Sequence, residues 1–232
     1  MIEFSNVTKR FGKVTALDNL SATINKGKIT GIMGPNGAGK STMLKLIIDI
    51  NKPTFGDVMI GGQRVSVETK KRISYLPEVD YFYPWMRVID AKEFIKPFYS
   101  DWDEEAYKEL LTFLELDESM KINKISKGMR AKVKLLLSFS RRADIVLLDE
   151  PLSGIDIFTR AKIIETIIKD YRVGEQSIVI TTHEVDEIEN VIDEALFLDK
   201  GQIALAGEVE SLKEKMNLSV IDIMKEVYND GK

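Results

Sequence analysis

The sequence predicts an α/β fold in which a largely parallel sheet is interrupted by a helical lobe. Two short apolar runs, "DIVLLDE" and "SIVITTH", are separated by "IFTRAKIIETIIKDY", which has helical periodicity. Apolar runs that alternate with helices indicate strands buried in a parallel sheet. Between Asp90 and Arg142 the periodicity is helical and no strand stands out. We therefore expect a helical lobe over residues 79–139.

The first third of the chain has the alternation of β-strands. The segments "MIEFSNV", "KVTALDNLSATI" and "KITGIMG" are separated by Gly and Asn, and "GDVMIGGQRV" has the glycines of a hairpin. We expect these strands to form an N-terminal antiparallel β subdomain beside the core. The next segment, "GKSTMLKLIIDI", turns helical, and its apolar positions are Met43, Leu44, Leu46, Ile47 and Ile50.

The C-terminal part predicts a hairpin followed by a helical tail. "EALFLDKGQIALAG" turns through Lys200 and Gly201, and "VESLKEKMNLSVIDIMKEVY" is amphipathic. We expect one domain over residues 1–232, with a core of 1–78 and 140–207, a helical subdomain of 79–139 and a tail of 208–232. The tail is expected to pack on the core, and a regulatory or dimerising role is the alternative.

The composition narrows the class of protein. Of the 232 residues, 44% are hydrophobic and 30% are charged, as expected of a folded globule. The net charge of −4 argues against nucleic acid as a partner. The absence of cysteine excludes disulfides and thiolate sites, and fits a reducing compartment. The sequence has neither a signal peptide nor an apolar run near the roughly 20 residues of a spanning helix, so a membrane role would require a partner.

The stretch "GPNGAGKS", residues 34–41, has the spacing of a phosphate-binding loop. It follows a predicted strand and opens a helix, so backbone N–H groups and the helix start can bind phosphate oxygens. Lys40 is expected to reach the β- and γ-phosphates, and the Ser41 hydroxyl to bind Mg²⁺. The alternative is a Gly-rich turn, which the complete motif makes the poorer explanation. The loop therefore predicts a nucleotide site.

Two carboxylates end the apolar run "IVLLDE". The carboxyl ends of parallel strands are where ligands bind in open α/β sheets. Asp149 is expected to hold Mg²⁺ through water, and Glu150 to act as the general base for the attacking water. An acidic exit from a strand is the alternative. The only histidine, His183, ends the neighbouring run and is expected at the same sheet edge, where it could contact the γ-phosphate.

The order of the phosphate loop, the helical lobe, "ISKGM", "IVLLDEP", "SGID" and "TTHE" resembles the ATP-binding subunit of an ABC transporter over essentially the whole chain. The resemblance implies a P-loop NTPase with a RecA-like core, and ATP and Mg²⁺ as its ligands. It assigns ATP binding to the loop residues Gly34, Pro35, Asn36, Gly37, Ala38, Gly39, Lys40, Ser41 and Thr42.

"ISKGM" occupies the place of the family's L-S-G-G-Q signature. Members form a head-to-tail dimer with ATP sandwiched at the interface, so Ser126, Lys127 and Gly128 would contact the ATP held by a partner. That partner would be a second copy or another ABC ATPase subunit. A lone chain would bind ATP but hydrolyse it poorly. Similar S-K-G-M versions occur among bacterial exporter-type members, and Lys127 could contact the partner's phosphate or simply be solvated.

Further positions resemble the family pattern one by one. Phe11 falls where an aromatic ring stacks on adenine, although a core-facing strand Phe is the alternative. Asp156 resembles the aspartate that communicates across the dimer. Glu78 stands where a glutamine is expected. Its carboxylate could still bind Mg²⁺, but it adds a charge and loses an amide donor.

The segment from Tyr81 to Trp85 is dense in aromatic residues. Core packing of the lobe explains some of these rings, but they follow one another too closely for all to face one core. In the resembled fold this segment lines a groove for transmembrane permease subunits. The resemblance thus implies ATP-driven transport, with export favoured, by a cytoplasmic subunit held peripherally on the inner face of the membrane. A soluble ABC ATPase, such as an iron–sulfur cluster assembly component, is the alternative.

Overall fold

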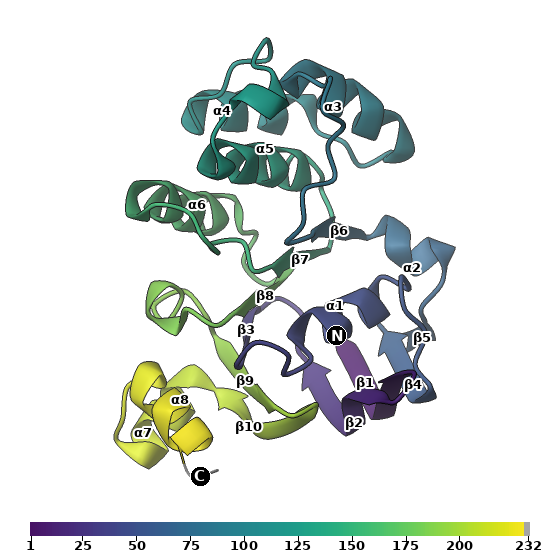
Figure 1. The fold of residues 1–232 in the computed structure, drawn as a ribbon, viewed down its shortest axis with the longest axis vertical. Helices are drawn as coiled ribbons and strands as arrows, with labels where there is room; N and C mark the ends of the chain where they lie inside the picture. Colours follow the sequence, from purple (N-terminus) through teal and green to yellow (C-terminus); the bar gives the residue numbers. More distant parts are fainter. Residues whose placement is uncertain (230–232) are drawn as a thin grey trace.

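The strands of the chain form two sheets in the computed structural model, which describes residues 1–229 (Figure 1). An antiparallel sheet has the order β2-β1-β4-β5. Its strands are β1 (Ile2–Phe11), β2 (Val14–Ile24), β4 (Phe55–Ile60) and β5 (Gln63–Arg64). This sheet is the predicted N-terminal β subdomain.

The larger sheet has the order β10-β9-β3-β8-β7-β6. Its strands are β3 (Ile29–Met33), β6 (Ile73–Leu76), β7 (Ile145–Asp149), β8 (Ser177–Thr182), β9 (Glu194–Asp199) and β10 (Gln202–Glu208). All pairs are parallel except β9 with the edge strand β10. Every residue of β3, β7 and β8 is buried, which explains why apolar residues predominate in these strands. The predicted α/β fold is confirmed.

The register of the parallel strands brings three loops to one edge. Met33 pairs with Thr182, and Asp149 pairs with Thr181. β3, β7 and β8 therefore end level with one another, so the segments that follow them emerge side by side. These segments are the phosphate loop, Glu150 and His183.

Helix α1 (Lys40–Ile47) joins the two sheets. Its buried residues Met43, Leu44, Leu46 and Ile47 share a core with side chains of both sheets. Fully burying a side chain of this size stabilises the fold by about 1.5–3 kcal/mol, so the start of α1 is held firmly against the sheet edge. Ile50, which the periodicity placed on this helix, lies beyond its end and is 64% exposed.

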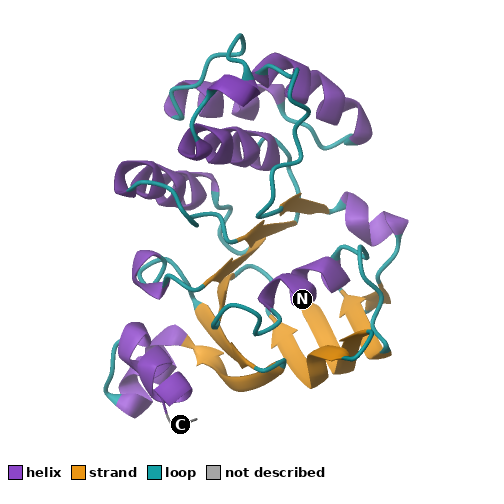
Figure 2. Cartoon of the chain, viewed as in Figure 1, coloured by secondary structure: helices purple, strands orange, loops and turns teal. Residues whose placement is uncertain are grey.

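The helices between β6 and β7 form a lobe at the top of Figure 2. They are α3 (Val88–Ile95), the short 3₁₀ helices η1 (Lys96–Phe98) and η2 (Ile122–Lys124), α4 (Glu104–Phe113) and α5 (Lys127–Phe139). Among them, α5 contacts β6 of the larger sheet. Ser126 begins α5 by accepting a hydrogen bond from the Met129 N–H at 3.1 Å. α5 packs against α4 on one side and α6 (Ile157–Asp170) on the other, so it links the helical lobe to the sheet core.

Several elements differ from the sequence expectations. The short helix α2 (Val67–Lys71) and the strand β6 were not predicted, and the 3₁₀ helix η3 (Val185–Glu187) follows His183. The tail contains two helices, α7 (Val209–Met216) and α8 (Val220–Asn229). Asn217 ends α7 in the left-handed conformation, with φ of 54°, so one continuous helix is impossible there.

Candidate nucleotide site

The phosphate loop joins β3 to α1 at the sheet edge. Gly39 has φ of 112°, and a Cβ at this position would lie 2.7 Å from the Ala16 carbonyl oxygen. Only glycine fits both the backbone conformation and the space. The tail contacts the strand that leads into the loop, because the Tyr228 hydroxyl of α8 lies 3.1 Å from the carbonyl oxygens of Met33, at the end of β3, and of Leu198 in β9.

Lys40 connects the loop to the carboxylate after β7. Its side chain is only 6% exposed, and Nζ donates to the Gly34 carbonyl oxygen at 2.8 Å. The same Nζ lies 3.1 Å from Glu150 Oε1. A buried ammonium inside a loop of backbone N–H groups is suited to bind phosphate oxygens.

Glu150 is held between a cation and an imidazole. Its second oxygen, Oε2, lies 2.8 Å from His183 Nδ1. The backbone of Glu150 has a positive φ of 47°, which is uncommon for a residue other than glycine. Two hydrogen bonds from its N–H to the Oγ1 and carbonyl oxygen of Thr181 hold it there. With 8% of its side chain exposed, this carboxylate is positioned to accept a proton from a water.

Asp149 is 2% exposed and accepts three side-chain hydrogen bonds. Ser41 Oγ donates to Oδ1 at 2.7 Å, and Thr181 Oγ1 donates to Oδ1 at 2.9 Å. The Tyr75 hydroxyl donates to Oδ2 at 3.1 Å. A hydroxyl and a carboxylate that converge are hard oxygen donors of the kind Mg²⁺ takes, so the residues fit this ion.

Lys40, Ser41, Glu150 and His183 line a cavity of about 600 Å³. Its lining includes the loop residues from Asn36 to Thr42 and the side chains of Phe11, Glu78, Glu150 and His183. Phe11 is 47% exposed at the end of β1, so it is not a core residue. Of the residues predicted to bind this chain's own ATP and Mg²⁺, the cavity lining lacks Gly34 and Pro35, at the start of the same loop, and Asp149, which is hydrogen-bonded to Ser41.

The signature residues Ser126 and Gly128 do not line this cavity. A Cβ on Gly128 would lie 3.1 Å from Thr159 Oγ1, so glycine allows α5 to start close to α6. Asp156 caps α6 by accepting the Thr159 N–H at 3.0 Å. The exposed Lys127 reaches over Gly154 and lines a small cleft with Glu150.

Several residues in and around the site, among them Thr181, were missed by the sequence analysis. Tyr75 was missed because β6 is only four residues long and was not recognised as a strand. Lys134 was missed as an ordinary charged helix residue, although its neighbours Val133, Leu135 and Leu136 are apolar and buried. Its Nζ donates to the carbonyl oxygens of Pro77 and Glu78, each at 2.9 Å, and burial lowers the pKa of Lys134. Lys134 thereby ties the Glu78 segment to α5.

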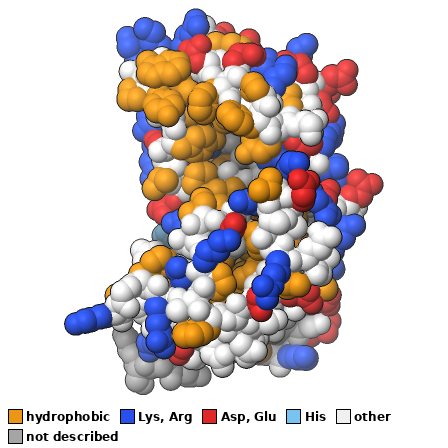
Figure 3. All heavy atoms as spheres, turned by 90° about the vertical axis from the view of Figure 1, so that its right-hand side faces the viewer, with side chains coloured by type: hydrophobic (Ala, Val, Ile, Leu, Met, Phe, Trp, Pro, Cys, Tyr) orange, Lys and Arg blue, Asp and Glu red, His pale blue; other side chains and the backbone are white. Residues whose placement is uncertain are grey.

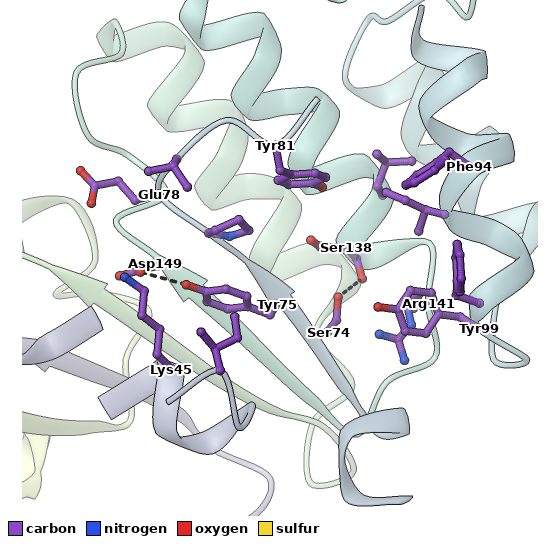
Figure 4. Close-up of a pocket in the computed structure, with 16 residues that line it drawn as sticks. Lys45, Ser74, Tyr75, Glu78, Tyr81, Phe94, Tyr99, Ser138, Arg141 and Asp149 are labelled. Carbon is purple, nitrogen blue, oxygen red and sulfur yellow. Dashed lines mark hydrogen bonds between the residues drawn. The ribbon is translucent and has the colours of Figure 1, made fainter. Parts of the chain in front are cut away.

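A second cavity, of about 500 Å³, lies beside the nucleotide site, between α1, β6 and the helical lobe (Figure 4). We call it the groove. Tyr75, Glu78 and Asp149 contribute to its polar end, and Tyr81, Phe94, Ile95, Phe98 and Tyr99 contribute to its apolar wall. Figure 3 shows hydrophobic side chains gathered around the hollowed face.

An exposed row of aromatic rings leads from the groove. Tyr83 stacks on Trp85 with centroids 5.9 Å apart, and Phe94 meets Tyr83 edge-on at 6.1 Å. Phe98 continues the row 6.0 Å from Phe94. Trp85 is 66% exposed and Phe98 is 72% exposed, so these rings face outward and not toward a core.

Comparison with known proteins identifies the family. A family model described as "ABC transporter" matches residues 17–153, from the β subdomain to the carboxylates after β7. The chain belongs to the ABC transporter family. The resemblance inferred from the motifs is therefore confirmed, and the chain is an ATPase of this family. The exporter-like subgroup suggested by S-K-G-M stays a prediction.

Curated relatives support this placement along most of the chain. The ABC transporter ATP-binding protein YtrB of Bacillus subtilis is 31% identical over 217 residues, which cover 93% of this chain and 74% of YtrB. The uncharacterised ABC transporter ATP-binding protein MJ1023 of Methanocaldococcus jannaschii is 33% identical, with coverage of 93% and 80%. Other relatives are a linearmycin resistance ATP-binding protein, LnrL of Bacillus subtilis, 29% identical, and a zinc import ATP-binding protein, ZnuC of Rickettsia conorii, 30% identical.

Solved structures share the fold. An ATP-binding subunit of an ABC transporter aligns with a TM-score of 0.86 at 22% identity, covering 98% of this chain and 99% of that one. The bacterial ABC transporter cassette MJ0796, solved as a dimer, aligns with a TM-score of 0.77 at 26% identity, covering 90% and 98%. Within residues 1–229, no helix is both long enough and apolar enough to cross a membrane.

Proposed function

We propose that this chain hydrolyses ATP as half of a head-to-tail dimer and thereby drives export through partner membrane subunits. The observation that carries the proposal is the division of the predicted site residues. The phosphate loop, Glu150 and His183 line one cavity, while Ser126 and Gly128 lie outside it, at the start of α5. A chain arranged in this way holds one part of a site and offers another part to a neighbour.

The residues of the cavity have distinct roles in this proposal. The loop N–H groups and Lys40 bind the phosphates, and the ring of Phe11 stacks on adenine. Glu150 accepts the proton of the attacking water, while Lys40 and His183 fix the direction of its two oxygens. With Nδ1 on Glu150, Nε2 is the ring nitrogen of His183 that is left to face the γ-phosphate, where negative charge develops. When bound at Ser41 and Asp149, with Glu78 near, Mg²⁺ would neutralise phosphate charge.

The signature of a partner chain completes the site. The Ser126 hydroxyl and the first N–H groups of α5 form a helix start that can bind an anion. In a head-to-tail dimer they would contact the γ-phosphate held by the other chain, and Asp156 would lie at the same interface. The dimeric MJ0796 cassette supports dimerisation. The partner is a second copy or another ABC ATPase subunit.

The groove is the proposed docking site for a membrane subunit. Its wall and the neighbouring aromatic row expose large apolar rings. Contiguous exposed rings of this kind mark surfaces that bind a partner. A short amphipathic helix that projects from a permease could bury one apolar face there, so that the chain sits on the inner face of the membrane. The names of YtrB and ZnuC support a transport role. We favour export because of the S-K-G-M signature.

Site-specific crosslinking tests the docking proposal. Because the chain has no cysteine, Tyr83→Cys introduces a single thiol that can carry a benzophenone crosslinker. With native membranes that contain the transporter, we expect a crosslink to a multi-spanning membrane protein. A thiol at Val173, which is 81% exposed and outside the groove, serves as the matched control. Equal crosslinking from both positions, or none from Tyr83→Cys, would contradict the proposal.

A further inference from the structure

The two oxygens of the Asp149 carboxylate have different partners. Oδ1 accepts hydrogen bonds from Ser41 and Thr181, while Oδ2 accepts one from the Tyr75 hydroxyl. Among residues 1–229, Tyr75 is the only hydrogen-bond partner of Oδ2. The dashed line in Figure 4 marks this contact. The orientation of the carboxylate therefore depends on a ring that belongs to a different strand, β6.

Metal binding would leave this contact in place. A hydroxyl that binds Mg²⁺ through a lone pair can still donate its hydrogen, so Ser41 and Thr181 would stay on Oδ1 and Tyr75 on Oδ2. Hydrogen bonds on both oxygens fix the rotation of the carboxylate plane, whereas bonds on Oδ1 alone would leave Oδ2 free to turn. Partners of this kind, outside the metal's own ligands, tune metal affinity.

The same tyrosine belongs to the groove. Tyr75 pairs with Leu147 in the register of β6 and β7, two residues before Asp149, and its ring lines the groove together with Tyr81 and Tyr99 (Figure 4). Any group that fills this end of the groove touches the ring that holds Asp149. This route to the carboxylate does not pass through Glu78.

We propose that Tyr75 is a positioning residue that holds Asp149 in its metal-binding orientation from the floor of the groove. The inference rests on the proposed Mg²⁺ site at Ser41 and Asp149. It assigns to the Tyr75 hydroxyl an effect on Mg²⁺-dependent nucleotide binding, and none on the binding of ATP without metal.

A comparison of ATP affinities with Mg²⁺ and with EDTA tests the proposal without relying on turnover. The measurements use the Glu150→Gln chain, so that ATP is not consumed, and fluorescence titration of an ATP analogue. Tyr75→Phe keeps the ring and removes the hydroxyl. In EDTA, we expect the ATP affinity of the Tyr75→Phe variant to equal that of the Glu150→Gln chain without this change, which is the background. The gain in ATP affinity on adding Mg²⁺ should fall about 10-fold.

Tyr99→Phe is the matched control, because Tyr99 lines the same groove but stacks on Arg141 and has no hydrogen bond to Asp149 among the described contacts. The gain in ATP affinity that this variant shows on adding Mg²⁺ should equal that of the background. If Tyr75→Phe lowered the ATP affinity equally in Mg²⁺ and in EDTA, the role of Tyr75 would be merely structural and the proposal would be overturned. An unchanged gain in ATP affinity on adding Mg²⁺ would overturn it as well. If the background itself gained nothing from Mg²⁺, the proposed metal site would fail and this inference with it.

Discussion

At the scale of single residues, the proposed hydrolysis depends on how Glu150 is held. Its carboxylate lies between Lys40 and His183, and its unusual backbone conformation is fixed by Thr181. A group that is buried and held at both oxygens has little freedom, so it is already oriented when a water arrives. Neither contact could be read from the sequence, which placed these residues at one sheet edge without giving the pairs they form.

Glu150→Gln should abolish turnover and keep nucleotide binding. Glutamine has the same shape but cannot accept the proton, and general base catalysis typically contributes about 10²–10⁴-fold to a rate. Phosphate release should therefore fall by at least about 100-fold, while the affinity for ATP stays within a few-fold of that of the unaltered chain. Unchanged phosphate release would remove Glu150 from the role of base.

At the scale of elements, patterns in the sequence predicted long or strongly apolar segments and missed short ones. β7 and β8 were recognised because burial on both faces demands continuous apolar residues. β6, with four residues, has too few positions to show a pattern, although it carries Tyr75. The division of the tail into two helices depends on one left-handed residue, Asn217, which amphipathic periodicity does not reveal.

The helical lobe contains a charged cluster that links three elements. Glu104 at the start of α4 accepts hydrogen bonds from Lys92 of α3 at 2.6 Å, Lys96 of η1 at 2.9 Å and the indole of Trp102 at 3.1 Å. The hydrogen bond from Lys92, followed by those from Lys96 and Trp102, lowers the pKa of Glu104 to about 2 from its usual 4.5. The contribution of this carboxylate to stability is thus present above pH 4.5 and lost as the pH falls toward 2.

Glu104→Gln should destabilise the chain at neutral pH and hardly at all in strong acid. Because the side chain is 35% exposed, solvent screens the pairs, and we expect a loss of about 1 kcal/mol in the free energy of unfolding at pH 7. The difference between the two chains should shrink between pH 4.5 and pH 2. Urea unfolding at several pH values measures it, and a difference that stays constant with pH would contradict the assignment.

At the scale of the whole molecule, the sequence predicted most of the residues that line the cavity at the phosphate loop, but not the groove beside it. The loop, Glu150 and His183 each follow an apolar strand of the predicted parallel sheet. The carboxyl ends of such strands lie at one edge of the sheet, so the sequence predicted that these residues lie close together. The groove is formed by α1, β6 and the helical lobe, whose relative placement depends on tertiary packing. In the sequence, the aromatic segment from Tyr81 to Trp85 was the one indication of an exposed surface here. The structure adds Phe94 and Phe98 to these rings.

Removing the exposed rings should separate docking from ATP binding. Replacement of Tyr83 and Trp85 by alanine removes two stacked rings that lie outside the nucleotide cavity. Buried aromatic anchors at an interface are commonly worth about 2 kcal/mol or more, so binding to membranes that hold the partner subunits should weaken by at least about 30-fold. Sedimentation with those membranes measures binding, and a parallel loss of ATP affinity would indicate core packing instead.

Dependence of turnover on protein concentration tests the central claim most directly, because only a dimer would bring the signature of one chain to the nucleotide of the other. The rate per chain should rise with concentration in step with the dimer fraction measured by light scattering, and should approach zero for dilute monomer that still binds ATP. Ser126→Ala should lower the rate of the dimer. A rate per chain that is constant down to monomeric concentrations would contradict the account.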